Sequence, residues 1–115
     1  MKFFRSFRFA WSGLIYALRS QFNMRTHVAA LLVVVVAGLY WQVTATEWCV
    51  LLLAATVVIV AELMNTAMEE LVDFVSPEHH PKAGRVKDIA AAAVLVASFF
   101  AAVVGFIIFG RYLLP

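Results

Sequence analysis

The sequence has few charged residues. Asp, Glu, Lys and Arg make up 14% of its 115 residues, whereas hydrophobic types make up 64%. Soluble domains average about 25% charged and about 45–50% apolar residues. A single domain of this length, over residues 1–115, also buries too small a share of its surface to hide such an excess. The composition therefore excludes an ordinary soluble domain and indicates apolar side chains that face lipid or other subunits.

Several other features are missing. The one cysteine, Cys49, excludes an intrachain disulfide. There is no Walker-type glycine loop and no pattern of a nucleophilic triad. No signal peptide is expected, because the first long apolar run begins only at Val28 and no clean cleavage pattern follows it. The net charge is +2, but the basic residues flank apolar runs, so nucleic acid is not an expected partner.

Residues 1–26 carry the pattern of an amphipathic helix. Basic residues fall mostly between apolar residues at helical spacing, which are Phe3, Phe4, Phe7, Trp11, Leu14, Ile15 and Leu18. Aromatic residues on one side and basic residues on the other are typical of a helix at the membrane surface. Packing of this helix against the rest of the protein is the alternative, and the two are compatible.

Three apolar segments follow, at residues 28–46, 48–72 and 89–109. The third contains twenty uncharged residues from Ile89 to Ile108, about the length that crosses ~30 Å of hydrocarbon. Val33–Val36 would favour a strand in water, but in a bilayer the backbone must satisfy its own hydrogen bonds, which favours a helix. We therefore expect an all-α integral membrane protein with a surface helix and three transmembrane helices.

The positions of Lys and Arg predict the orientation. Five precede the first span, Lys82, Arg85 and Lys87 lie between the second and third spans, and none lies in the turn at 44–47. By the positive-inside rule, the N-terminus and residues 74–88 are expected on the cytoplasmic side. Arg111, near the C-terminus, is a minor exception.

A stripe of polar residues crosses the second span. Glu62, Asn65, Glu69 and Asp73 are spaced at i, i+3, i+7 and i+11, which places them on one side of a helix. Glu62 lies about 15 Å along the helix from Val72, so we expect it below the lipid headgroups. An ionisable residue at that depth is costly, which makes it a functional candidate. The alternative is a structural Glu62, either protonated or paired with a basic residue of another helix.

The polar residues together suggest phosphoryl transfer. Clustered carboxylates repel one another unless a cation such as Mg²⁺ neutralises them, and Lys87 is placed to contact a phosphate. Asp88 has an alternative role as a cap or dipole partner at the start of a helix. His79 and His80 lack a third ligand and are expected to be loop histidines. Glu62 is then positioned to accept the proton of a lipid hydroxyl.

These residues resemble a known family, the prokaryotic diacylglycerol kinase and undecaprenol kinase family. The resemblance covers nearly the whole chain. It rests on Glu62-Leu-Met-Asn65-Thr-Ala-Met-Glu69-Glu-Leu-Val-Asp73, Glu78-His-His80-Pro and Gly84-Arg-Val-Lys87-Asp88, and also on Ser6-Phe7…Ala10…Gly13 and Asn23-Met24-Arg25…His27.

The resemblance implies transfer of the γ-phosphate of MgATP to a lipid alcohol in the bacterial inner membrane. It implies a homotrimer with active sites between neighbouring subunits. It assigns Glu62 as the catalytic base and Glu69 as a Mg²⁺ ligand, with Asn65 and Asp73 in support. Nucleotide contacts are assigned to Glu78, His80, Lys87 and Asp88.

One position departs from the family pattern. Members often carry a second metal-binding Glu near the end of the surface helix, where this chain has Gln21. A Gln carbonyl also coordinates Mg²⁺, but more weakly and without neutralising its charge. The Asn-Met-Arg-x-His stretch resembles the undecaprenol kinase branch, which favours undecaprenol over diacylglycerol as substrate.

Two alternatives from other classes stay open at this point. One is a small proton-coupled transporter, although such chains usually have four spans with the Glu in the first. The other is a non-catalytic membrane subunit. Whichever function holds, three thin helices are not expected to shield the acidic cluster of the second span by themselves. This predicts partner helices from other subunits.

Overall fold

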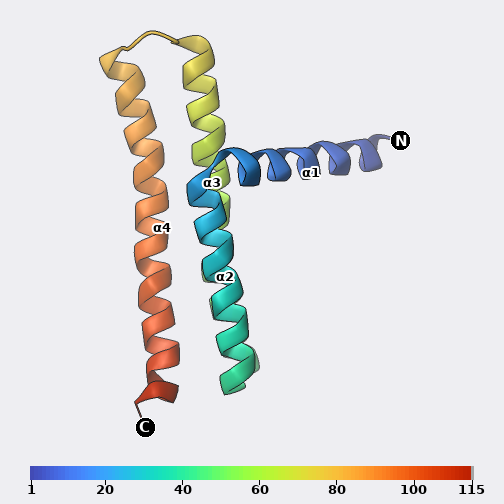
Figure 1. Ribbon diagram of the computed structural model, residues 1–115, viewed down its shortest axis with the longest axis vertical. Coiled ribbons are helices and arrows are strands. Elements are labelled where there is room, and N and C mark those ends of the chain that lie inside the picture. Colours follow the sequence, from blue (N-terminus) through green and yellow to red (C-terminus); the bar gives the residue numbers. More distant parts are fainter. Residues whose placement is uncertain (115) are drawn as a thin grey trace.

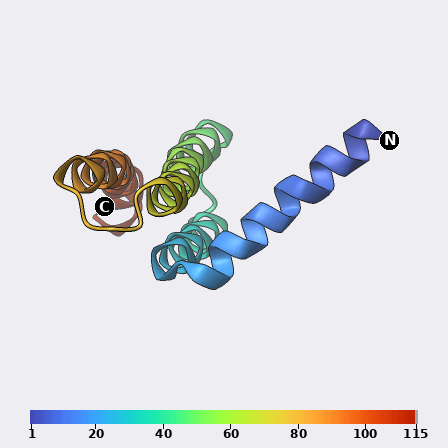
Figure 2. The same ribbon diagram turned by 90° about the horizontal axis from the view of Figure 1, so that it is seen from above.

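The computed structural model describes residues 1–114, all in helices and their connections. The helices are α1 (Lys2–Ser20), α2 (Phe22–Trp41), α3 (Ala45–Val75) and α4 (Pro81–Leu113). In Figure 1, α3 and α4 form a long antiparallel pair, and α1 leaves the bundle at a steep angle. Seen from above, α1 extends away from the other three helices (Figure 2). The expected all-α class, with an N-terminal helix preceding three long apolar ones, is confirmed.

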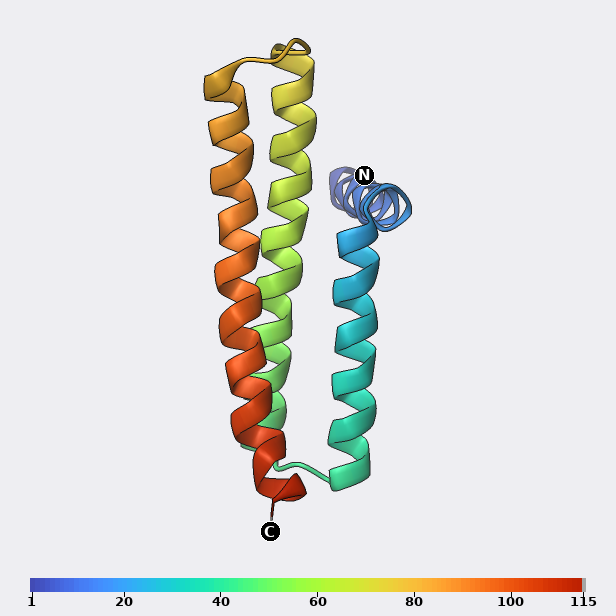
Figure 3. The ribbon, with the colours of Figure 1, turned by 60° about the vertical axis from the view of Figure 1, so that its left-hand side comes forward.

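The helices α2, α3 and α4 are each long and apolar enough to cross a membrane. α3 lies between the other two (Figure 3) and packs mainly against α4 and then α2. The 33 residues of α4 span about 50 Å, well beyond the ~30 Å of hydrocarbon. At the α3–α4 loop, both helices extend past the level of α1 (Figure 1).

The break between α1 and α2 falls at a single residue, Gln21. We expected a surface helix over residues 1–26, whereas Gln21 takes an extended backbone, with φ −116° and ψ 116°, and α2 begins directly after it. Arg25 stabilises the break, because its guanidinium donates hydrogen bonds to the carbonyls of Leu18 (3.0 Å) and Arg19 (2.9 Å). These belong to the last α1 carbonyls, which lack partners within the helix.

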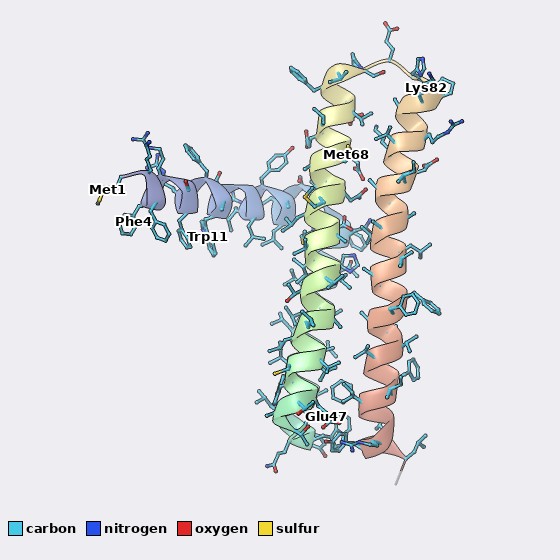
Figure 4. All side chains as sticks on the ribbon, turned by 180° about the vertical axis from the view of Figure 1, so that it is seen from behind. Met1, Phe4, Trp11, Glu47, Met68 and Lys82 are labelled. Atoms are coloured by element: carbon cyan, nitrogen blue, oxygen red, sulfur yellow. The ribbon has the colours of Figure 1, made fainter. Side chains whose placement is uncertain are left out.

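The helix α1 is amphipathic and is also held to the bundle. Its Phe4 and Trp11 side chains lie on the side toward which the spanning helices run (Figure 4). At its other end the Tyr16 hydroxyl donates a hydrogen bond to the Glu70 carboxylate of α3, and Ala17 is buried. The arrangement fits a helix on the membrane surface that also packs on α3.

The turn between α2 and α3 is tightly capped. α2 ends at Trp41, five residues before the expected end of the first span, because Gln42 takes the left-handed conformation with φ 52°. Thr44 then caps α3: its hydroxyl accepts from the Glu47 amide (3.2 Å), and the Glu47 carboxylate accepts from the Thr44 amide (2.9 Å). This reciprocal pair satisfies two amides at the start of α3.

Glu47 also joins the start of α3 to the end of α4. It accepts hydrogen bonds from the Tyr112 hydroxyl (2.6 Å) and the Arg111 guanidinium (2.5 Å), at the end of the bundle opposite the α3–α4 loop (Figure 4). Arg111, the exception to the expected charge pattern, is therefore paired with a carboxylate. Beside this cluster lies a small apolar core of Val43, Leu51 and Ile108.

The helix α4 begins eight residues before the apolar run that predicted it. Pro81 occupies its first turn, and the His80 side chain caps it by accepting a hydrogen bond from the Lys82 amide (3.1 Å). Proline suits this position because the first amides of a helix lack internal partners. The alternative role of Asp88 as a cap is thus wrong, since Asp88 lies two turns inside the helix.

Candidate active site

Glu62 is buried within the single chain. Only 1% of the residue is exposed, and neither carboxylate oxygen accepts a hydrogen bond from any described residue. The neighbouring Thr66 hydroxyl is satisfied locally, since it donates to the Glu62 carbonyl (2.9 Å). A buried carboxyl group without donors is costly, so its retention in an apolar helix is characteristic of a functional group rather than of a stabilising one.

Glu62 lies far along α3 from the α2–α3 turn and close to α1. It lies 17 residues after the first residue of α3, which is about 26 Å along the helix axis and close to the ~30 Å needed to cross. Independently, α1 borders the next part of α3, where Leu63, Thr66 and Glu70 line a shared pocket with α1 residues. Glu62 therefore directly precedes the part of α3 that α1 borders.

Among the described residues, His27 of α2 is the basic side chain within ion-pair distance of the Glu62 carboxylate. Its Nε2 lies 3.5 Å from Glu62 Oε2, and 19% of its side chain is exposed. From the sequence we expected no specific role for His27. A signal was present in the sequence, because His27 is a polar residue near the start of the first apolar helix, five residues after its first residue.

The other members of the polar stripe become more exposed toward the α3–α4 loop. Asn65 is buried and donates from Nδ2 to Glu69 Oε1 (2.8 Å). Its own Oδ1 is buried without a donor among the described residues. Glu69 is half-buried, and 64% of the Asp73 side chain is exposed. The stripe thus runs from the buried carboxyl group of Glu62 to the exposed carboxyl group of Asp73.

The acidic residues fit a Mg²⁺ ion that arrives with phosphate rather than a preformed metal cage. Among residues 1–114 no three acidic, Cys or His side chains are grouped as ligands. Mg²⁺ commonly uses only one or two protein carboxylates, completed by phosphate oxygens and water. Glu69 offers such a carboxylate, with the unpartnered Asn65 oxygen nearby. Gln21, the other expected ligand, forms the backbone junction between α1 and α2.

The expected nucleotide-contacting residues lie around the projecting α3–α4 end. Lys87 Nζ lies 2.5 Å from Asp73 Oδ1, so this pair links α4 to the end of the stripe. His80 is already engaged as the cap of α4. Glu78 and Asp88 are exposed. The structure thus connects Lys87 to Asp73 and leaves Glu78 and Asp88 exposed.

The chain shields more of the stripe than we expected. Glu62 and Asn65 are buried within the single chain, so the expectation that one chain does not shield the acidic cluster is wrong for Glu62. His27 of α2, 3.5 Å from the Glu62 carboxylate, contributes to this shielding. Glu69 and Asp73, further along, remain half-buried and exposed.

An apolar groove begins at His27 and runs between α2, α3 and α4 toward the opposite end of the bundle. Its volume is about 290 Å³, and small residues make up much of its lining, among them Ala30, Ala54, Ala55, Ala101 and Gly105. The hydroxyl of Ser98, which also lines it, is buried without a partner among the described residues. The site thus has an apolar side and a polar side that meet at the His27–Glu62 pair.

Comparisons with known proteins agree on one family. Residues 8–109 match the sequence profile described as prokaryotic diacylglycerol kinase. The chain is 35% identical over 108 residues to an undecaprenol kinase of Bacillus subtilis, covering 94% of this chain and 88% of the relative. It is 33% identical over 95 residues to a diacylglycerol kinase of Escherichia coli, covering 83% and 78%.

A diacylglycerol kinase of Synechocystis sp. is 40% identical over 111 residues. The match covers 96% of this chain but 61% of that relative, so the chain spans less than two thirds of its length.

Proposed function

The chain belongs to the prokaryotic diacylglycerol kinase family and is a membrane lipid kinase, and from that premise we propose that it transfers the γ-phosphate of MgATP to the hydroxyl of a membrane lipid alcohol. The observation that carries the proposal is the buried Glu62 carboxyl group, which has no hydrogen-bond donor among residues 1–114 and directly precedes the part of α3 that α1 borders. A lipid hydroxyl at the headgroup level would supply the missing donor.

Glu62 acts as the general base in this proposal. Its carboxylate accepts the proton of the lipid hydroxyl while the alkoxide oxygen forms a bond to the γ-phosphorus and the bond from phosphorus to the β,γ-bridging oxygen breaks. The products are the lipid phosphate, ADP and a proton on Glu62. Exclusion of water by the surrounding helices disfavours hydrolysis of ATP in place of lipid phosphorylation.

The nucleotide binds on the aqueous side of Glu62. Lys87 contributes positive charge to the phosphates, which requires that it exchange its Asp73 partner for a phosphate oxygen. Glu78, His80 and Asp88 contact the rest of the nucleotide. Glu69 and Gln21 would hold Mg²⁺, which would neutralise phosphate charge. Asn65 orients the Glu69 carboxylate through its hydrogen bond.

Undecaprenol is the favoured substrate and diacylglycerol the next. The Asn23-Met24-Arg25-x-His27 stretch supports this preference, and the Bacillus subtilis relative is named an undecaprenol kinase. Other relatives are named diacylglycerol kinases. Both alcohols present a primary hydroxyl at the membrane surface, so the residues around Glu62 suit either.

We place the protein in the bacterial inner membrane with α1 and the α3–α4 loop on the cytoplasmic side. The distribution of Lys and Arg supports this orientation, and the supply of ATP requires it. We further propose a homotrimer. Many large apolar side chains are exposed on every helix, and the half-buried Glu69 leaves room for a neighbouring subunit to complete the site.

The test is transfer of labelled γ-phosphate from MgATP to lipid in mixed micelles, with undecaprenol and diacylglycerol offered side by side. Glu62→Gln, which keeps the shape of the side chain but removes the base, is the control variant. Labelled undecaprenyl phosphate from the wild type, lost in the variant, is the expected result. Labelled phosphatidic acid would assign diacylglycerol as the substrate instead. No transfer to either lipid from folded wild-type protein would refute the proposal.

A further inference from the structure

We propose that Ser98 of α4 positions the lipid substrate, and that the apolar groove beside it holds the hydrocarbon chain of the lipid alcohol. The Ser98 hydroxyl donates a hydrogen bond to the oxygen of that alcohol. Its own oxygen is buried without a partner among residues 1–114, and Ser98 lines the groove together with His27. The inference rests on the proposed function, because it concerns the lipid substrate of that reaction.

Ser98 differs from other hydroxyl-bearing residues of these helices. A Ser or Thr inside a helix can donate to the backbone carbonyl four residues earlier. Four hydroxyls of this chain do so at oxygen–oxygen distances of 2.7–3.1 Å, those of Ser20, Thr26, Thr56 and Thr66. Ser98 lies in an apolar stretch of α4 and leaves its hydroxyl unbonded. A buried hydroxyl without a partner is costly, and an acceptor on a bound lipid would remove that cost.

The ion pairs at the two ends of α3 and α4 place Ser98 level with Glu62. The Lys87–Asp73 pair joins the helices near their loop. Ser98 lies eleven residues after Lys87, and Glu62 lies eleven residues before Asp73. Counted from the ion pair at the other end of the bundle, Glu62 is fifteen residues away and Ser98 thirteen, a difference of about 3 Å along the axis. Because the two helices are antiparallel (Figure 1), both counts put the Ser98 hydroxyl and the proposed base at one level of the bundle.

The groove leads from this level toward the opposite end of the bundle. Its lining includes Val58, one turn before Glu62 on α3, and His27, whose Nε2 lies 3.5 Å from the Glu62 carboxylate. On α4 it runs from Ser98 to Phe109, about 16 Å along the helix. Apart from His27 and Ser98, every lining residue is apolar. The groove therefore suits an alcohol with its oxygen at one end and an unbroken hydrocarbon chain behind it, whereas an ester carbonyl further along would find no donor.

The first test is the kinase assay in mixed micelles, with undecaprenol and MgATP varied separately. Ser98→Ala should raise the KM for undecaprenol about two- to tenfold, the effect of one lost hydrogen bond, and leave the KM for MgATP unchanged. Ser98→Thr, which keeps a hydroxyl, should retain the wild-type KM. Thr56→Val is the matched control, because the Thr56 hydroxyl already donates to the Leu52 carbonyl. An undecaprenol KM that Ser98→Ala does not change would overturn the role of Ser98.

Photolabelling tests the groove without kinase activity. The full chain in micelles is irradiated with a geranylgeraniol analogue that carries a diazirine on its chain, and the labelled peptides are mapped by mass spectrometry. Adducts on groove residues, displaced by undecaprenol but not by phosphatidylcholine, are the expected result. Ser98→Ala should weaken this labelling. Gly105→Leu should remove most of it, because Gly105 lines the groove and a Cβ there meets nothing within 4 Å. Gly110→Leu is the matched control, since that position is equally open but lies outside the lining.

The outcomes separate this inference from the proposed function. Groove labelling that depends on Ser98, in a protein that phosphorylates neither lipid, would refute the proposed function alone. Labelling that phosphatidylcholine displaces equally would mean that ordinary phospholipid tails fill the groove. No labelling of the groove would mean that something else covers it, such as a helix of a second copy. Either of these last two results would overturn the inference.

Discussion

Replacement of Gly38 by alanine should loosen the packing of α2 against α3. A methyl group at this position would lie 2.5 Å from Cη2 and 2.8 Å from Cζ2 of Trp48, well inside ordinary van der Waals contact. The indole ring is half-buried and packs on the small core around Leu51, so it has little freedom to move away. The clash therefore separates the two helices that bring His27 and Glu62 together.

The expected cost is the net of two effects. Inserting a methyl group into a packed site typically costs about 1–3 kcal/mol, whereas alanine in place of glycine in a helix contributes up to about 1 kcal/mol in its favour. The balance is a destabilisation of about 1–2 kcal/mol. For a chain of this size that corresponds to a fall in Tm of about 4–8 °C.

Thermal unfolding in detergent micelles, followed by circular dichroism, measures this shift. Gly110→Ala is the matched control, because a methyl group there meets nothing within 4 Å, and its Tm should not fall. In the double variant Gly38→Ala/Trp48→Phe, the smaller ring should relieve the clash, so the two changes should cost less together than the sum of their separate effects. An unchanged Tm for Gly38→Ala, or strictly additive effects, would refute this account of the α2–α3 contact.

Three further predictions concern the candidate site and the contact between α1 and α3. Glu62→Gln should lower turnover by about 10²-fold or more while the protein still inserts in the membrane, and turnover assays showing wild-type rates would exclude Glu62 as the base. Glu69→Gln should raise the Mg²⁺ concentration for half-maximal activity, whereas Glu70→Gln should not; identical Mg²⁺ titrations for both would count against Glu69 as a ligand. The Glu70 carboxylate raises the pKa of the Tyr16 hydroxyl, through its hydrogen bond and its negative charge, so the α1–α3 contact should persist to pH above about 10 and weaken as Tyr16 ionises. Trp11 fluorescence against pH should report that transition in the wild type, and a transition unchanged in Tyr16→Phe would contradict its assignment.

The sequence patterns did not predict where the helices begin and end. Hydropathy located three spans but misplaced their boundaries, since the break at Gln21 depends on Arg25 reaching back to α1 carbonyls. The start of α4 depends on His80 and Pro81, which precede the apolar run. Hydropathy reports the lipid-facing stretch of a helix, and capping contacts decide where the helix itself begins and ends.

The sequence by itself determined the membrane class, the number of spanning helices and the placement of the polar stripe on one side of the second. These depend on composition and on the 3.6-residue period, which are local properties of the chain. Only the tertiary structure decided that His27 faces Glu62, that Lys87 pairs with Asp73 and that Glu47 joins α3 to α4. Each of these contacts joins different helices, and their register is set by packing of side chains across the interface, which no single-helix period contains.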